Sequence, residues 1–189
     1  GIRGVGRCPD RAPPLDRPSS VRYAATSGKP DLWVHPLAAA TRGLEGTELA
    51  EIALMREAGG RAVSTGRRWI GCSGTMLRLL RYCAMLGMVV VTHAEDGGLA
   101  GDAVATAGEM ATRLGLPSAP AEAEALAVAR DIALAELAGA AIHFRQVTTA
   151  AALDLVRAAR LRGLAVTAGV TPAHFMLSDI AVSDFRTFA

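Results

Sequence analysis

Short apolar runs alternate with helical patterns along the chain, and this alternation constrains the fold more than any other feature. The apolar runs occupy residues 2–7, 31–37, 61–64, 88–93, 140–147 and 163–168. Each run has the length and composition of a buried strand, and a helical pattern follows it. Repeats of strand and helix predict parallel strands that are joined by right-handed crossovers.

Three of the helical patterns have recognisable ends. They cover residues 45–58, 120–138 and 148–161. Gly59 and Gly60 are expected to end the first helix. Glu122 and Glu124 lie in the first turn of the second helix, where carboxylates interact favourably with the helix dipole. Threonines open the third helix as N-caps, and arginines close it.

These repeats favour a barrel over other parallel folds. Six strand–helix units make up more than half of a (β/α)8 barrel, and no GxGxxG motif favours a dinucleotide-binding sheet. We therefore predict an α/β fold, an incomplete TIM barrel of about six parallel units, with residues 1–189 forming one partial-barrel domain. Both ends of the chain resemble cuts through a larger fold. A flavodoxin-like open sheet is the alternative.

Composition excludes several classes of protein. The net charge is +2, Lys29 is the only lysine, and the arginines are interspersed with acidic residues, so we expect no nucleic-acid partner. The three cysteines form no CxxC motif, which argues against a disulfide framework and a cysteine-built zinc site. No apolar run reaches the roughly 18 residues of a membrane span. We therefore expect a soluble cytoplasmic protein.

The stretch VVVTHAED places a histidine at the position where a barrel has its active site. His93 directly follows an apolar strand, and the carboxyl ends of barrel strands hold the active site. A neutral imidazole can bind zinc through one nitrogen while Glu95, Asp96 or a backbone carbonyl orients the other. A lone histidine at a strand end is more often structural. His93 is therefore a candidate remnant of a metal site.

Several segments, in order, resemble one enzyme family. They are GIRGVGRCPDRAPPLD, GLEGTELAEIALMREAG, THAEDGGLAG, LPSAPAEAEALAVARDIALAE and IHFRQVTTAAALDLVRAARLRGLAVTAGVTPAHFMLSD. In this order they resemble the core of bacterial dihydroorotases of the amidohydrolase superfamily. The resemblance implies a (β/α)8 barrel with one or two zinc ions, which activate a water for attack on the ring amide of dihydroorotate. The reverse reaction closes carbamoyl-aspartate in pyrimidine biosynthesis.

When the family's metal ligands are matched residue by residue to this sequence, the metal site is incomplete. His93 matches a metal-binding histidine, and His143 matches the first histidine of H-x-x-H, but Gln146 replaces the second, which is a ligand. The loop that reads S-D-D-G in relatives reads STGR here, which leaves Thr65 and Gly66 at the position of a metal-binding aspartate. The H-x-H pair of the first strand and the catalytic aspartate of the last would lie outside residues 1–189. We assign no catalytic residue and expect zinc to bind weakly or not at all.

Substrate-binding positions also differ from the family. The family's M-P-N-T, whose asparagine helps to hold the substrate, reads Cys8, Pro9, Asp10 and Arg11. Asp10 and Arg11 are therefore the candidate substrate-binding residues, and Asp10 would repel an anionic substrate unless Arg11 compensates. The family's E-V-T-P-H-H motif reads GVTPAH here, so its last histidine is retained as His174.

Three hypotheses follow. The first is a dihydroorotase-like pseudoenzyme that has lost its metal site and persists as a scaffold, a partner subunit or a homo-oligomer. The second is an active zinc-dependent dihydroorotase or related cyclic amidohydrolase, completed by segments outside this chain, in which His93, His143 and His174 form an altered site. The third is an unrelated α/β binding domain. Both of the first two hypotheses predict that Thr65, His93 and Gln146 converge at the carboxyl ends of their strands.

Overall fold

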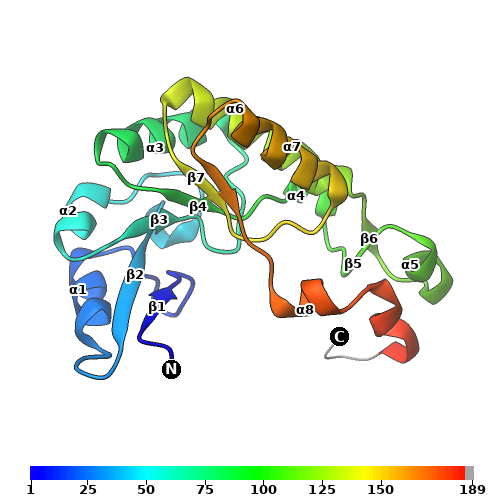
Figure 1. The fold of residues 1–189 in the computed structure, drawn as a ribbon, viewed down its shortest axis with the longest axis horizontal. Coiled ribbons are helices and arrows are strands. Elements are labelled where there is room, and N and C mark those ends of the chain that lie inside the picture. Colours follow the sequence, from blue (N-terminus) through cyan, green and yellow to red (C-terminus); the bar gives the residue numbers. More distant parts are fainter. Residues whose placement is uncertain (186–189) are drawn as a thin grey trace.

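The computed structural model describes residues 1–185 and shows a curled, six-stranded parallel sheet (Figure 1). The strands follow the order β1-β2-β3-β4-β7-β8. Their bounds are Gly4–Arg7, Trp33–Ala39, Ala62–Ser64, Val90–Thr92, Ile142–Phe144 and Val166–Ala168. All five pairings are parallel. Each strand lies within or overlaps a predicted apolar run, and the sequential order is that of a barrel. The predicted incomplete barrel is confirmed.

Helices cover the outer face of the sheet, and the inner face is open (Figure 1). The main helices are α1 (Pro18–Thr26), α2 (Ile52–Glu57), α3 (Ser73–Met85), α6 (Glu122–Ala138) and α7 (Ala150–Leu161). The core lies between these helices and the sheet, where strand residues such as Val63, Val90 and Phe144 are fully buried with Leu79 and Leu80 of α3. Within residues 1–185, no helix has both the length and the apolarity needed to cross a membrane.

Helix α2 begins later than the sequence pattern predicts. The predicted helix covered residues 45–58, but the helix spans Ile52–Glu57. The preceding segment turns at Gly46, which has a φ of +80°, and then pairs with the residues just after β2 through an antiparallel bridge between Thr41 and Leu49. These backbone contacts hold residues 45–51 outside the helix. The predicted stop at Gly59 is confirmed by its φ of +108°, directly after the helix.

A small extension interrupts the strand–helix alternation between β4 and α6. It consists of α4 (Gly97–Ala100), β5 (Ala105–Thr106), α5 (Glu109–Leu114) and β6 (Ser118–Ala119), in which β5 and β6 form a separate two-stranded parallel sheet. The remaining short elements are η1 (Arg42–Leu44), α8 (Pro172–Met176) and η2 (Asp179–Phe185). The extension projects beside the carboxyl end of β4 (Figure 1), so it helps to enclose the site that His93 occupies.

Candidate functional site

The loops after β3, β4 and β7 meet at one edge of the sheet. Thr65 directly follows β3, and its hydroxyl accepts a hydrogen bond from the backbone N–H of His93 over 3.2 Å. The N–H of Arg145 donates to the Thr92 carbonyl over 2.9 Å, which joins the end of β7 to that of β4. Thr65, His93 and Gln146 therefore converge at the carboxyl ends of neighbouring strands, as expected for a barrel.

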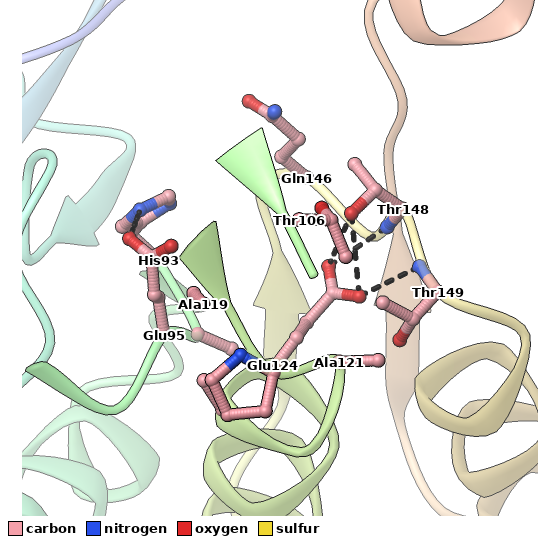
Figure 2. Close-up of a pocket in the computed structure, with 12 residues that line it drawn as sticks. His93, Glu95, Thr106, Ala119, Ala121, Glu124, Gln146, Thr148 and Thr149 are labelled. Atoms are coloured by element: carbon pink, nitrogen blue, oxygen red, sulfur yellow. Dashed lines mark hydrogen bonds and ion pairs between the residues drawn. The ribbon is translucent and has the colours of Figure 1, made fainter. Parts of the chain in front are cut away.

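A cavity of about 80 Å³ opens at this edge (Figure 2). His93 and Glu95 line one wall, whereas Glu124, Gln146 and Thr148 line another. The rest of the lining includes Thr106 and Ala119 of the extension between β4 and α6 and several further alanines. The cavity thus combines polar and small apolar side chains from different segments.

His93 faces a carboxylate inside this cavity. Its Nε2 atom lies 3.4 Å from Oε2 of Glu95, and the two side chains are 25% and 50% exposed. Asp96, which the sequence offered as another partner, has a different role. Its Oδ1 atom accepts hydrogen bonds from the N–H groups of Gly98 and Leu99 and caps α4. Glu95 is therefore the acid that orients His93.

The other two histidines near strand ends have polar partners of their own. Nε2 of His174 lies 3.1 Å from the side-chain amide nitrogen of Gln146, and its Nδ1 atom lies 2.6 Å from the Thr171 hydroxyl. His143 lies 2.8 Å from the Thr167 hydroxyl through Nδ1, and burial lowers its pKa. Gln146 and His174 thus lie next to each other just beyond the strand ends. His143 instead lies within β7 and contacts Thr167, its neighbour on β8.

The described residues do not by themselves form a metal site. Among residues 1–185, no three His, Cys, Asp or Glu side chains lie close enough together to hold a metal. At the converging strand ends the chain offers His93, the hydroxyl of Thr65, the amide of Gln146 and the side-chain-free Gly66. Catalytic zinc sites use about three protein ligands drawn from His, Cys, Asp and Glu. Of the positions in this chain that match ligands of the family, only His93 therefore supplies a suitable donor.

Asp10 lies at the same mouth but pairs with arginines that the sequence analysis missed. Its Oδ2 atom lies 3.2 Å from Nε of Arg67 and 3.4 Å from Nη1 of Arg145. Arg11, which would have to compensate this charge for an anionic substrate to bind, is exposed and forms no ion pair with Asp10 in the described structure. The sequence did contain a hint that these arginines lie at the site. Arg67 directly follows Gly66 and Arg145 directly precedes Gln146, and both Gly66 and Gln146 match ligand positions of the family.

Glu124 joins α6 to the start of α7. Its two carboxylate oxygens accept hydrogen bonds from the backbone N–H groups of Thr148 and Thr149, each over 2.7 Å (Figure 2). Glu124, which the sequence placed in the first turn of a helix, therefore links α6 to the start of the next helix.

Comparison with known proteins supports one family. The profile of the family described as "Dihydro-orotase-like" matches residues 9–152. The "Dihydroorotase" of Pelotomaculum thermopropionicum is 42% identical over 188 residues, which cover 99% of this chain and 44% of that protein. The "Dihydroorotase" of Ruminiclostridium cellulolyticum is 37% identical over 191 residues, covering 100% and 45%. The chain thus spans less than half the length of these curated relatives.

Solved structures share the fold at lower identity. The L-hydantoinase (dihydropyrimidinase) of Arthrobacter aurescens superposes with a TM-score of 0.74 and 20% identity over 96% of this chain and 42% of that one. The dihydropyrimidinase of Brevibacillus agri gives a TM-score of 0.71 and 21% identity over 98% and 42%. These similarities support the barrel architecture alone.

Proposed function

Because this chain belongs to the dihydroorotase-like family, we propose that it is a pyrimidine-biosynthesis protein of that family whose own residues do not build a working metal centre. In the family, zinc activates the water that attacks the cyclic amide. On this proposal the chain binds zinc weakly or not at all and does not turn over dihydroorotate. Its role is that of a scaffold or partner subunit in the cytoplasm. The three cysteines, all free thiols, agree with a reducing compartment.

One observation carries this proposal, namely the side chain at the carboxyl end of β7. Gln146 stands where the family resemblance implies a histidine ligand, and its amide is directed to His174 rather than to His93. A neutral amide is a poor zinc ligand, and Thr65 supplies no negative charge to balance a cation. The proposed impairment thus rests on residues inside the chain.

The test is metal content together with turnover. The purified chain is dialysed against zinc, freed of excess metal, and assayed for bound zinc and for hydrolysis of dihydroorotate. We expect far less than one zinc per chain and no turnover above the protein-free rate. The variant Gln146→His should gain little zinc, because Thr65 and Gly66 still lack the carboxylate. Stoichiometric zinc with turnover that His93→Ala abolishes would contradict the proposal.

A second candidate is an active cyclic amidohydrolase with an altered site, completed by segments outside this chain. The contact between Gln146 and His174 favours it, because a second imidazole is thereby held beside Gln146, which lines the same cavity as His93. This candidate predicts that His174→Ala and His93→Ala both lower zinc binding by the chain. The first candidate predicts that neither variant changes the small amount bound.

A further inference from the structure

The segment that follows β8 differs from the segments that follow the other strands of the main sheet. Strands β1, β2, β3, β4 and β7 each lead to a helix on the outer face (Figure 1). Residues 169–185 instead run along the open side of the sheet, where η2 packs against α5 of the extension (Figure 1). We call these residues the strap, because they connect the free edge of the sheet to the extension.

Backbone hydrogen bonds fix the first residue of the strap beside the end of β7. The N–H of Gly169 donates to the Phe144 carbonyl over 2.9 Å, and the Gly169 carbonyl accepts from the N–H of Val147 over 3.0 Å. A Cβ atom on Gly169 would lie 2.9 Å from the Arg145 carbonyl oxygen, so this close approach requires glycine. The start of the strap is therefore held next to residues 145–147.

Beyond Gly169, a single side-chain pair joins residues 170–181 to the rest of the described chain by hydrogen bonding. The pair consists of the Gln146 amide and the His174 imidazole, with 3.1 Å between the two Nε2 atoms. The other hydrogen bonds of residues 170–181 lie within the strap. His174 is fixed on the strap side, because the Thr171 hydroxyl accepts from its backbone N–H and lies 2.6 Å from its Nδ1 atom.

Apolar packing contributes little to the stability of α8. The helix has five residues and buries none of them, and Phe175, Met176 and Leu177 are 78%, 75% and 50% exposed. Helices of this length are unstable in water by themselves, so tertiary contacts must hold α8. The hydrogen bond between Gln146 and His174 therefore supplies a large share of the free energy that keeps α8 folded in this place.

We propose that Gln146 is a positioning residue that holds the strap closed, so that His174 lies at the candidate site only while their hydrogen bond is formed. In the closed state, His174 lies beside Gln146, which lines the same cavity as His93. In the open state, α8 unfolds, and the strap stays attached through Gly169 and through the packing of η2 on α5. Such local opening requires much less free energy than global unfolding. The proposal goes beyond both candidate functions, because the contact requires no metal and no substrate.

The test is hydrogen exchange of the metal-free chain, measured by mass spectrometry on peptides from residues 170–181. The N–H groups of Phe175 and Leu177 donate to carbonyls within the strap, so their exchange reports the opening of α8. Gln146→Leu removes the amide at similar side-chain size and should speed this exchange about three- to tenfold, as expected for one lost hydrogen bond. Gln146→Glu keeps an acceptor for the imidazole and should stay within about twofold of the unchanged chain.

Two comparisons separate this role from a general loss of stability. Glu95→Gln alters another polar side chain of the same cavity, one without a hydrogen bond to the strap, and should leave exchange in the strap unchanged. In Gln146→Leu, peptides from α6 and α7 should exchange at the rates of the unchanged chain. Faster exchange in α6 and α7 as well would overturn the proposal, as would unchanged exchange in the strap.

A double variant tests whether Gln146 and His174 act together. His174→Ala removes the same hydrogen bond from the strap side, so Gln146→Leu combined with His174→Ala should exchange no faster in the strap than His174→Ala alone. If the two effects multiply instead, the side chains act independently and the proposal is wrong. Thermal unfolding of each variant confirms that folded proteins are compared.

Discussion

At the scale of single residues, the carboxylate of Glu124 makes the most specific contact at the candidate site. It accepts two short hydrogen bonds from backbone N–H groups at the start of α7, where the helix dipole also favours negative charge. Glu124→Gln should lower the free energy of unfolding by about 1–2 kcal/mol, as measured by urea denaturation. Glu122→Gln is the matched control, because Glu122 lies exposed in the same first turn of α6. Equal losses in both variants would contradict this role for Glu124.

Two cysteines should differ widely in reactivity. Cys72 is exposed, and hydrogen bonding from Thr75 lowers the pKa of its thiol. Burial raises the pKa of Cys83 to about 12. Since the thiolate is the reactive form, Ellman's reagent near pH 7.5 should modify Cys72 quickly and Cys83 only after unfolding. The rapid phase should disappear in Cys72→Ser, and its persistence there would assign it to another thiol.

Cys83 should also make the stability of the protein depend on alkaline pH. Its pKa in the folded chain is about 12, above the ordinary value of 9.0, so the folded state disfavours the thiolate. The contribution of the protonated thiol to the free energy of unfolding is therefore complete below pH 9 and is lost as the pH rises toward 12. The free energy of unfolding should fall by at most about 1.4 kcal/mol per pH unit in this range. Urea unfolding between pH 8 and 11 measures the slope. Cys83→Ala should flatten it, and an unchanged slope would exclude Cys83 as its source.

Some of the candidate site could be predicted at the residue scale, and some could not. His93 was identifiable because a histidine that directly follows an apolar strand must lie at the strand's carboxyl end. The partners of Asp10 were not identifiable, because Arg145 lies 135 residues away in sequence and no local pattern encodes such a contact. The role of Asp96 as the cap of α4 depends on a four-residue helix that is too short to give a periodic signal.

At the scale of elements, a buried ion pair ties α6 to the end of β4. Asp131 is fully buried, accepts a hydrogen bond from the Thr92 hydroxyl over 3.3 Å, and pairs with Nε of Arg130 over 2.9 Å. The Arg130 guanidinium stacks 3.7 Å from the ring centre of Trp69 and also donates to the Gly71 carbonyl. This network therefore fixes the strand that presents His93.

Breaking that network should be costly. Asp131→Ala leaves Arg130, whose side chain is 18% exposed, without its carboxylate, so the free energy of unfolding should fall by about 3 kcal/mol. Asp154→Ala removes an exposed ion pair on α7 and should cost less than about 1 kcal/mol. Urea denaturation of both variants provides the measurement. A loss below about 1 kcal/mol in Asp131→Ala would show that the network does not stabilise the fold.

Elements that alternate regularly were predictable, and those that break the alternation were not. Apolar runs indicated all six strands of the main sheet. The reason is clearest for β3, β4 and β7, which are covered by helices and bury most of their side chains, whereas the edge strands β1 and β8 are more exposed. The predicted start of α2 was wrong. The helical spacing of Leu49, Ile52 and Ala53 suggested one helix, but the backbone of residues 48–50 bonds to residues 40–42, directly after β2. Strands β5 and β6 have two residues each, which is too short for any pattern.

At the scale of the whole molecule, the sheet has two edge strands and an uncovered inner face. Strands β1 and β8 each pair with one neighbour, and exposed apolar side chains include Trp33, Val170 and Phe175. Unpaired strand edges and exposed apolar surface both favour association with another chain. Both features predict that this chain associates with another chain.

The purified 189-residue chain should therefore self-associate, with a larger mass at higher concentration in sedimentation velocity experiments. A lysine on the free edge of β8 should oppose this, because charged side chains disfavour edge-to-edge pairing. Ala168→Lys, at an exposed position of that strand, should shift the distribution toward monomer. Ala158→Lys, exposed on α7, adds the same charge away from the edge and should leave the distribution unchanged. A single monomeric species at every concentration would contradict self-association, and equal shifts in both variants would show that net charge, rather than the edge of β8, controls it.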